Sequence, residues 1–153
     1  MEARSPDGAL ARGSVATRSK GSIMDYRELV IDHLVRPQPA YKVNHAVMTG
    51  WDNTARRPDL ANTFVNATPE VYEIWLREIV ALTVEKREPE ERLVFVNAWN
   101  EWAEGAHLEP DRRYGLQYLE ATRRAVCDEP LDGAPFTRFS SRTRFENKRS
   151  FVR

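Results

Sequence analysis

Hydrophobic positions along the chain alternate between helical and strand spacing. Apolar residues recur every three or four positions over residues 25–35, 69–84 and 114–127, which predicts three amphipathic helices. Residues 42–48 and 93–99 are short runs rich in Val and aromatic side chains, and they predict two strands, the second fully buried. The expected inward positions are Tyr26, Leu29, Val30, Leu34 and Val35 in the first helix, Val71, Ile74, Trp75, Ile79 and Leu82 in the second, and Leu116, Leu119, Ala121, Thr122 and Val126 in the third.

The ends of these segments carry the residues that begin and end helices. Thr68 followed by Pro69 is typical of a helix start, with threonine as the N-cap and proline in the first turn. Ser22 or Asp25 is expected to cap the first helix. Loops follow both predicted strands, at residues 49–59 and 100–113. The alternation of helices and strands predicts an α/β fold with a parallel sheet.

Two predicted strands cannot close a parallel sheet together with its helices, so the chain resembles the C-terminal part of a larger domain. Residues 1–21 are rich in Gly, Ser, Ala and Arg without periodicity, and we expect a disordered N-terminal extension there. Residues 132–153 form a basic tail that is also expected to be disordered. The folded part is therefore predicted to span residues 22–131.

Composition and charge narrow the classes of function. The chain is 41% hydrophobic and 30% charged, with a net charge of zero, as in a soluble globular protein. Residues 1–20 carry +2 and residues 132–153 carry +4, which leaves −6 for the middle. This acidic centre argues against a nucleic-acid partner there. The basic tail could contact phosphates, although a solvated terminus is the commoner role of such a segment.

The single cysteine and the absence of long apolar runs bear on location. Cys127 excludes an internal disulfide, and its helical context suggests a small hydrophobic residue. A reducing, cytoplasmic compartment is the expectation. The chain contains no run of about 18 apolar residues and no apolar segment near its N-terminus, so we expect no membrane segment and no signal peptide.

Polar and aromatic residues gather directly after the second predicted strand. Carboxylates beside indoles suit a sugar site, because indole faces stack on pyranose rings while carboxyl groups handle protons. The residues of this cluster are Asn97, Trp99, Asn100, Glu101, Trp102, Glu104, His107, Glu109 and Asp111.

Glu101 and Glu104 are the candidate catalytic pair. They are three residues apart in a turn leaving a strand, so both side chains can reach one cavity. Glycoside chemistry commonly uses two carboxyl groups, about 5–5.5 Å apart for retention and roughly 6.5–9.5 Å apart for inversion. The alternative is a surface loop with two solvated glutamates.

The remaining members of the cluster have a binding role and a structural alternative. Asn97 and Asn100 would hydrogen-bond a sugar hydroxyl or orient a glutamate, or they satisfy loop backbone. Trp102 is the better stacking candidate, because Trp99 lies in the strand alternation and could belong to the core. His107 is a substrate-binding candidate, although a structural role is the commoner one for a lone histidine.

Acidic residues at the end of this loop complete the set. Glu109 is assigned to substrate binding, and Asp111 could cap the last helix, where acids favour the helix dipole.

A second cluster follows the first predicted strand. Trp51 and Asp52 are candidate substrate-binding residues, and Gly50 before them allows a close backbone approach. Asp52 would bind a sugar hydroxyl or pair with Arg56 or Arg57.

Metal chemistry is not indicated. His45 is expected to be a satisfied core histidine, and the spacing of His45, His107 and the nearby acids matches no zinc motif. We therefore predict no metal and no cofactor.

Several of these motifs resemble one family. The segments are Gly50-Trp51-Asp52-Asn53-Thr54 with Arg56-Arg57, Thr68-Pro69-Glu70, Asn97 through Asp111, Tyr114-Gly115 and Tyr118-Leu119-Glu120-Ala121. They are similar to the C-terminal region of WbsX-type glycosyltransferases, polysaccharide-biosynthesis proteins related to glycoside hydrolase family 99. The resemblance covers about residues 23–127, whereas residues 1–20 resemble nothing in that family. It implies that residues 22–131 are the C-terminal part of a (β/α)8 barrel of the TIM type.

The resemblance also implies roles for the glutamates. In the family 99 hydrolases, which are endo-α-mannosidases, the motif Asn-Glu-Trp-x-Glu-Gly carries both catalytic carboxylates, and here it spans residues 100–105. By resemblance, Glu101 would act as base on the sugar 2-hydroxyl, which then attacks the anomeric carbon. Glu104 would protonate the leaving oxygen and later activate water, with retention of configuration. No cofactor is implied, and the partner would be a glycan or polysaccharide.

Two departures from the family pattern change the expectation. Ala103 stands where the hydrolases usually have histidine, so one contact to substrate is absent. The N-terminal half of a barrel does not lie in this sequence, and a separate N-terminal barrel half is therefore a possible partner.

Three hypotheses follow from the motif and the short length. In the first hypothesis, the chain cleaves or transfers glycosidic bonds in polysaccharide metabolism of the lipopolysaccharide or O-antigen type. In the second, it is a glycan-binding module without catalysis. In the third, it is an inactive truncated fragment.

Overall fold

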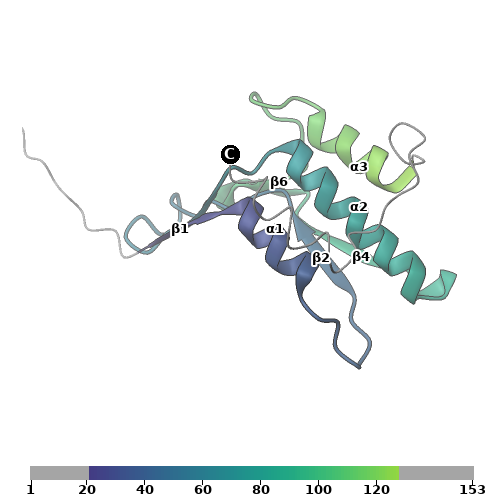
Figure 1. Cartoon of the computed structure of the whole chain (residues 1–153). Helices are drawn as coiled ribbons and strands as arrows, with labels where there is room; N and C mark the ends of the chain where they lie inside the picture. The colour runs from purple at the N-terminus through teal and green to yellow at the C-terminus, as the bar shows by residue number, and fades with distance from the viewer. Residues whose placement is uncertain (1–20, 128–153) are drawn as a thin grey trace, which may run out of the picture.

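A computed structural model of the chain describes residues 21–127 (Figure 1). The segments predicted to be disordered, residues 1–20 and 128–153, lie outside the described residues. The elements are β1 (Ser22–Asp25), α1 (Tyr26–Val35), β2 (His45–Met48), β3 (Asn62–Val65), α2 (Pro69–Lys86), β4 (Val94–Asn97), β5 (Asn100–Glu101), β6 (Ala106–His107) and α3 (Gln117–Cys127), with short 3-10 turns at Pro89–Glu91 and Trp102–Glu104.

The three predicted helices are present, and their starts follow the local sequence. The Thr68 side chain accepts a hydrogen bond from the Val71 N–H, and Pro69 is the first residue of α2. Asp25, one of the two candidates, caps α1 by accepting from the Arg27 N–H. Each cap satisfies a backbone donor that the helix itself leaves unpaired.

The four longer strands form two parallel pairs, which confirms the predicted α/β class. Strand β2 pairs with β4, and β1 pairs with β3. A backbone hydrogen bond of 2.8 Å from Phe64 N to Trp51 O links the two pairs. The described residues contain three two-stranded sheets and no closed barrel, so the partial barrel stays a prediction.

Strands β1 and β3 were not predicted from the sequence. Each has only four residues, and neither shows a clear alternation of apolar and polar side chains. Hydrogen bonding to a partner 40 positions away makes them strands, and a short sequence window carries no sign of that pairing.

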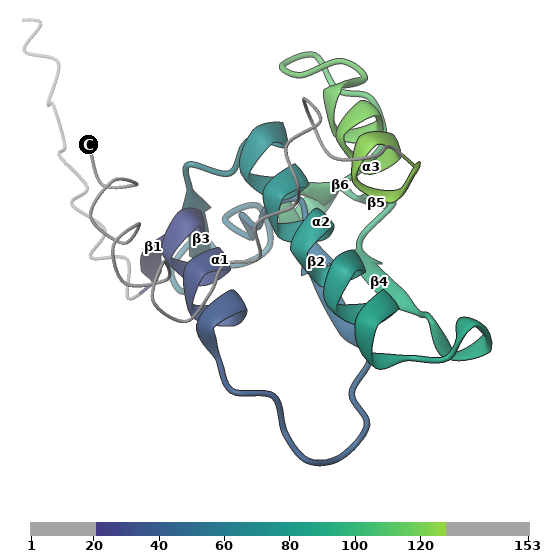
Figure 2. The same ribbon diagram turned by 45° about the vertical axis from the view of Figure 1, so that its right-hand side comes forward.

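The helices form one layer against the β2–β4 pair. Helix α2 lies on both strands, and α1 and α3 flank it (Figure 2). Tyr26, Tyr72, Leu76, Ile79 and Val47 are fully buried between these elements. No helix in residues 21–127 combines the length and the apolar character needed to cross a bilayer.

Several residues that we expected on the inner faces of the second and third helices face solvent, and α3 begins at Gln117 rather than at residue 114. Ile74 is 39% exposed, and Leu116 and Val126 are 55% and 58% exposed. Tyr72 and Tyr118 are buried instead, since their rings pack edge-on and their hydroxyls find partners at Thr122 and Thr49. The buried face of each helix is therefore set by these amphipathic tyrosines.

Cys127 lies in α3, as its helical context indicated, but it is not part of the buried face. Cys127 is exposed at the end of α3, one residue beyond the exposed Val126.

Only one face of the β2–β4 pair is covered. Val94 and Val96 pack against the core, whereas Phe95 between them is 56% exposed and its register partner Ala46 is exposed too. The prediction that the strand over residues 93–99 is fully buried was therefore wrong for this chain. The physical reason is that all three helices of the described part lie on the same side of the pair.

Candidate functional site

The two polar loops meet at one edge of the β2–β4 pair. Met48 and Asn97 are register partners at the ends of the two parallel strands, so the loops that follow leave from the same edge. The Asp52 N–H donates to the Glu104 carbonyl at 2.7 Å. This contact brings loops 49–59 and 100–113 together.

Gly105 makes this close approach possible. Its φ is +62°, a left-handed conformation, and an added Cβ would lie 3.0 Å from the Asp52 backbone nitrogen. Only glycine combines that backbone conformation with the short distance at low cost.

The glutamate loop contains a small hairpin that sequence patterns did not reveal. Strands β5 and β6 are antiparallel, with Asn100 opposite His107 and Glu101 opposite Ala106. Ala106 is fully buried and fixes the hairpin to the core. The glutamates are therefore carried by an ordered hairpin and the 3-10 turn at its tip.

Arg56 joins the two candidate catalytic glutamates. Its Nη2 lies 3.1 Å from Glu101 Oε1, and its Nη1 lies 3.0 Å from Glu104 Oε1. The side chains are partly exposed, at 53% for Arg56, 38% for Glu101 and 21% for Glu104. One guanidinium therefore brings both carboxylates to the same place.

Arg56 was considered in the sequence only as a partner of Asp52, and that pairing is absent from the described contacts. It lies in a turn where Asn53 O accepts from the Arg56 and Arg57 N–H groups. The Asn53 side chain is 8% exposed and accepts from Asn62 N, which fixes the turn. The adjacent Arg56 and Arg57 indicated that this loop binds an anionic group. The sequence could not show that the partners of Arg56 are Glu101 and Glu104.

Asp52 is held by neutral donors. Its Oδ1 accepts from the Thr54 N–H at 3.0 Å and from the Thr63 hydroxyl at 3.3 Å. The hydrogen bonds from Thr54 hold the pKa of Asp52 below its usual value, so the carboxylate is ionised at neutral pH.

Trp102, His107 and Glu109 form a stacked and hydrogen-bonded group. The Trp102 and His107 rings are 3.8 Å apart at 20°, and the Trp102 indole N–H donates to Glu109 Oε2 at 2.6 Å. Trp102 remains 49% exposed. Since the imidazole covers one indole face, Trp102 is held in a fixed orientation.

His107 also contacts Asp111, which does not cap α3, because that helix begins only at Gln117. His107 Nε2 lies 3.0 Å from Asp111 Oδ2, and Asp111 Oδ1 accepts from the Arg113 and Tyr114 N–H groups. Burial raises the pKa of Asp111, but these hydrogen bonds outweigh it and hold the pKa below its usual value. Asp111 thereby orders the turn that leads into α3.

The other predicted site residues are exposed and lie apart from these contacts. Trp99 is 53% exposed, which overturns the alternative that it belongs to the core. Asn97 and Asn100 are exposed as well. Trp99 contributes its carbonyl oxygen, which accepts from Leu108 N and Glu109 N at the base of the hairpin.

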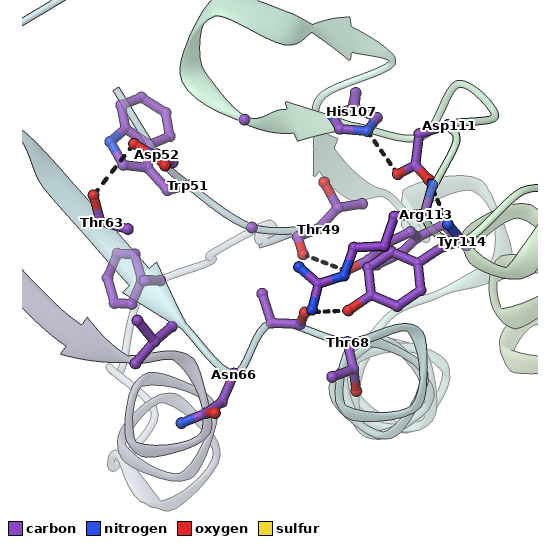
Figure 3. Close-up of a pocket in the computed structure, with 16 residues that line it drawn as sticks. Thr49, Trp51, Asp52, Thr63, Asn66, Thr68, His107, Asp111, Arg113 and Tyr114 are labelled. Carbon is purple, nitrogen blue, oxygen red and sulfur yellow. Dashed lines mark hydrogen bonds and ion pairs between the residues drawn. The ribbon is translucent and has the colours of Figure 1, made fainter. Parts of the chain in front are cut away.

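A cavity of about 520 Å³ lies beside the hairpin (Figure 3). It is bounded by the loop after β2, the strand β3, the start of α2 and the segment before α3. Trp51, Asp52 and His107 line it, together with Asp111 and Arg113. Glu101 and Glu104 do not line it, so the predicted site residues fall into a glutamate group and a cavity group.

The described residues contain no group of three or more His, Cys, Asp or Glu side chains placed to hold a metal ion. His45 is half-buried, and its ring lies 5.7 Å from that of His33.

Comparison with known proteins gives two findings. The family model for glycosyltransferase WbsX matches residues 3–122. An uncharacterised protein, WxcX, from each of two strains of Xanthomonas campestris pv. campestris is 43% identical over 110 residues, which is 72% of this chain and 16% of the relative. No solved structure matches.

The match corrects one expectation about the N-terminus. It begins at residue 3, whereas residues 1–20 were expected to resemble nothing in the family. The chain spans about a sixth of the length of the WxcX relatives. Since the family model covers most of the sequence, this chain belongs to the WbsX glycosyltransferase family.

Proposed function

We propose that the chain carries the paired-glutamate part of a site that cleaves or transfers glycosidic bonds in polysaccharide metabolism. Family membership supports a polysaccharide-related glycan enzyme. The observation that carries the finer proposal is the Arg56 fork, which holds Glu101 and Glu104 by its two terminal nitrogens. Two carboxyl groups at one place are what glycosidic chemistry requires.

The proposed roles follow the resemblance. Glu101 acts as base toward the sugar 2-hydroxyl, and Glu104 donates a proton to the leaving oxygen and then activates water or an acceptor hydroxyl. Arg56 Nη1 lies 3.0 Å from Glu104 Oε1. We propose that Arg56 moves off this oxygen when substrate binds and then faces the glycan.

The fold supports a proposal about the rest of the site. Parallel sheets normally have both faces covered, and the β2–β4 pair has one. We propose that residues 22–131 are the C-terminal part of a (β/α)8 barrel and that the remaining strands are supplied by further polypeptide. The glutamates follow β4 at the carboxyl edge of the pair, where barrels carry their active sites.

The test uses the purified chain, alone and together with the polypeptide proposed to supply the remaining strands, with a bacterial O-polysaccharide. Release of reducing ends reports hydrolysis, and mass spectrometry of added oligosaccharide acceptors reports transfer. Glu101→Gln and Glu104→Gln are each expected to reduce turnover at least about a hundredfold. Glu90→Gln, an exposed glutamate in the Pro89–Glu91 turn, is the matched control and keeps full activity.

Retained turnover in the Glu101→Gln, Glu104→Gln double variant would reject the catalytic roles. A non-catalytic glycan-binding module is the second candidate, favoured by the exposed Trp99 and Trp102 rings. In that case polysaccharide in the gel slows the migration of the wild-type chain in affinity electrophoresis, although no turnover is detected. Glu101→Gln is then expected to migrate as the wild type does.

A further inference from the structure

A second cavity lies at the edge of the β2–β4 pair opposite the glutamate hairpin. It has a volume of about 340 Å³, and its walls are the segment 38–45, which leads into β2, and the segment 82–87 at the end of α2. Figure 2 shows this end of α2 beside the start of β2, away from β5 and β6. Since the glutamates follow the carboxyl end of β4, this cavity is separate from the proposed glycosidic site.

The cavity is lined by cations and not by acids. Among its eleven described lining residues are Lys42, Lys86 and Arg87, and none of the eleven is Asp or Glu. Burial and the charge of Arg87 lower the pKa of His45, which also lines the cavity, so its imidazole is mainly uncharged at neutral pH. The walls therefore offer three positive charges and a neutral hydrogen-bonding ring.

Arg87 is the cation held most firmly in the wall. It is half-buried, and its Nη2 donates to Val43 O at 3.0 Å, which fixes the guanidinium between the two segments. Among residues 21–127 Arg87 forms no ion pair with a carboxylate, and the nearby acid Glu91 is paired with Lys42 instead. Charges that are removed from water normally have an anionic partner. Arg87 therefore indicates a place for an anion.

The end of α2 does not require Arg87 as a cap. Basic side chains near a helix C-terminus are favoured by the helix dipole and by its unpaired carbonyls. Arg92 serves that role here, since its Nε donates to Arg87 O at 3.2 Å and its Nη2 to Val84 O at 3.5 Å. The Arg87 side chain contacts Val43 on the other segment, so its position is explained better by the cavity than by the helix end.

The two lysines are held by ion pairs that a ligand can replace. Lys42 Nζ lies 2.5 Å from Glu91 Oε1, and Lys86 Nζ lies 3.1 Å from Glu85 Oε1. The side chains of Lys42 and Lys86 are 50% and 58% exposed. Exposed ion pairs contribute at most about 1 kcal/mol, so an anion in the cavity can compete for both ammonium groups.

We propose that this cavity binds the phosphate group of a phosphate monoester. Such a group carries about 1.5 to 2 negative charges near neutral pH and three acceptor oxygens, which suits cations on both walls, whereas a carboxylate carries one charge. Tyr41 and Leu82 add aromatic and apolar surface beside the cations. The volume lies in the ordinary range for small-molecule sites, so it accommodates the organic part of the ester as well.

The test separates two sources of the phosphate group. Isothermal titration calorimetry of the full chain at constant ionic strength uses glycerol 3-phosphate as a soluble ester, with sodium acetate as the anion without phosphorus. Co-sedimentation with phosphatidylcholine vesicles, with and without phosphatidic acid, tests a lipid headgroup. Binding of glycerol 3-phosphate is expected for a soluble ligand, and binding only to the vesicles with phosphatidic acid is expected for a lipid.

Two variants place the binding in this cavity. Arg87→Gln and Lys86→Gln are each expected to weaken binding about tenfold, because each removes a charge-assisted hydrogen bond. Lys86 is exposed, so Lys86→Gln should keep the wild-type melting temperature even if Arg87→Gln loses stability together with its bond to Val43. Arg57→Gln is the matched control, since it removes one positive charge from an exposed arginine outside the cavity and should leave binding unchanged.

Four results would overturn the proposal. The first is that neither phosphate probe binds the wild-type chain, and the second is that acetate binds as tightly as glycerol 3-phosphate. The third is that Arg87→Gln and Lys86→Gln both bind as tightly as Arg57→Gln. The fourth is a loss of phosphate binding in Glu101→Gln, which would place the phosphate at the glutamate hairpin.

Discussion

Arg56 is the residue that ties the loop after β2 to the glutamate hairpin. Arg56→Gln removes both ion pairs, and we expect amide hydrogen exchange in β5 and β6 to rise about fivefold because the hairpin loses this tie. Global stability should change by less than about 1 kcal/mol, since the pairs are partly exposed. Exchange mass spectrometry and urea unfolding measure the two effects.

Arg57→Gln is the control for this prediction. The Arg57 side chain is exposed and makes no ion pair among residues 21–127. Equal hairpin exchange in the two variants would show that the Arg56 fork contributes nothing to the order of the hairpin.

Glu73 is a buried acid whose charge is balanced by two arginines. It is 8% exposed, with Arg77 Nη2 at 2.9 Å and Arg124 Nη2 at 2.7 Å. Burial raises the pKa of Glu73, but the hydrogen bonds from Arg124 and Arg77 outweigh it and hold the pKa below the usual 4.5. The ionised form is therefore favoured by the folded state.

The sign of the pH effect follows from this direction. A carboxyl with a lowered pKa in the folded state stabilises the fold fully above pH 4.5, and that stabilisation is lost as the pH falls through the folded value. Glu73→Gln should therefore flatten the decrease in unfolding free energy below pH 4.5. Urea unfolding between pH 3.5 and 7 tests this, and an unchanged slope in Glu73→Gln would contradict it.

At the level of elements, the turn of the glutamate hairpin depends on its glycine. Gly105→Ala would place a methyl group in a left-handed residue and against the Asp52 backbone, and we expect a loss of about 2–3 kcal/mol. Gly115→Ala has a similar φ of +55° with no atom within 4 Å of the added Cβ, so it should lose only about 1 kcal/mol. Chemical denaturation of both variants measures the difference, and equal losses would show that the contact with Asp52 costs nothing.

The elements also show what sequence could and could not predict. The helix starts at Asp25 and Thr68 were predictable because capping is a local interaction. The burial of Tyr118 in place of Leu116 was not, since it depends on a hydrogen bond to Thr49, 69 positions away. Likewise the sequence indicated Glu101 and Glu104 as a pair, but the arginine between them comes from a loop 45 and 48 positions earlier.

For the molecule as a whole, the uncovered face of the β2–β4 pair predicts association. Phe95 is 56% exposed and Ala46 beside it is exposed, and apolar sheet faces of this kind are normally covered. We expect the full chain to self-associate, and Phe95→Ser should shift it toward monomer. Sedimentation velocity at several concentrations measures this.

The control for this prediction also replaces an exposed apolar side chain by serine, but outside the β2–β4 sheet face. Leu60→Ser removes a side chain that is 54% exposed on the loop before β3. If Leu60→Ser reduces association as much as Phe95→Ser, general surface hydrophobicity is responsible, and the sheet face has no special role.

The long reach of the parallel pairs has a consequence for the order in which the chain folds. Register partners in β1–β3 and β2–β4 are 40 and 49 positions apart, whereas partners in the β5–β6 hairpin are five to seven apart. Closing a long loop costs conformational entropy before stabilising contacts form, so we expect the two parallel pairs to form slowly. The β5–β6 hairpin closes only a short loop and can form early. The glutamates therefore acquire their turn early but meet Arg56 only after the late strand pairing. Folding followed in real time should show local order at the hairpin well before the β2–β4 pair is protected from amide exchange.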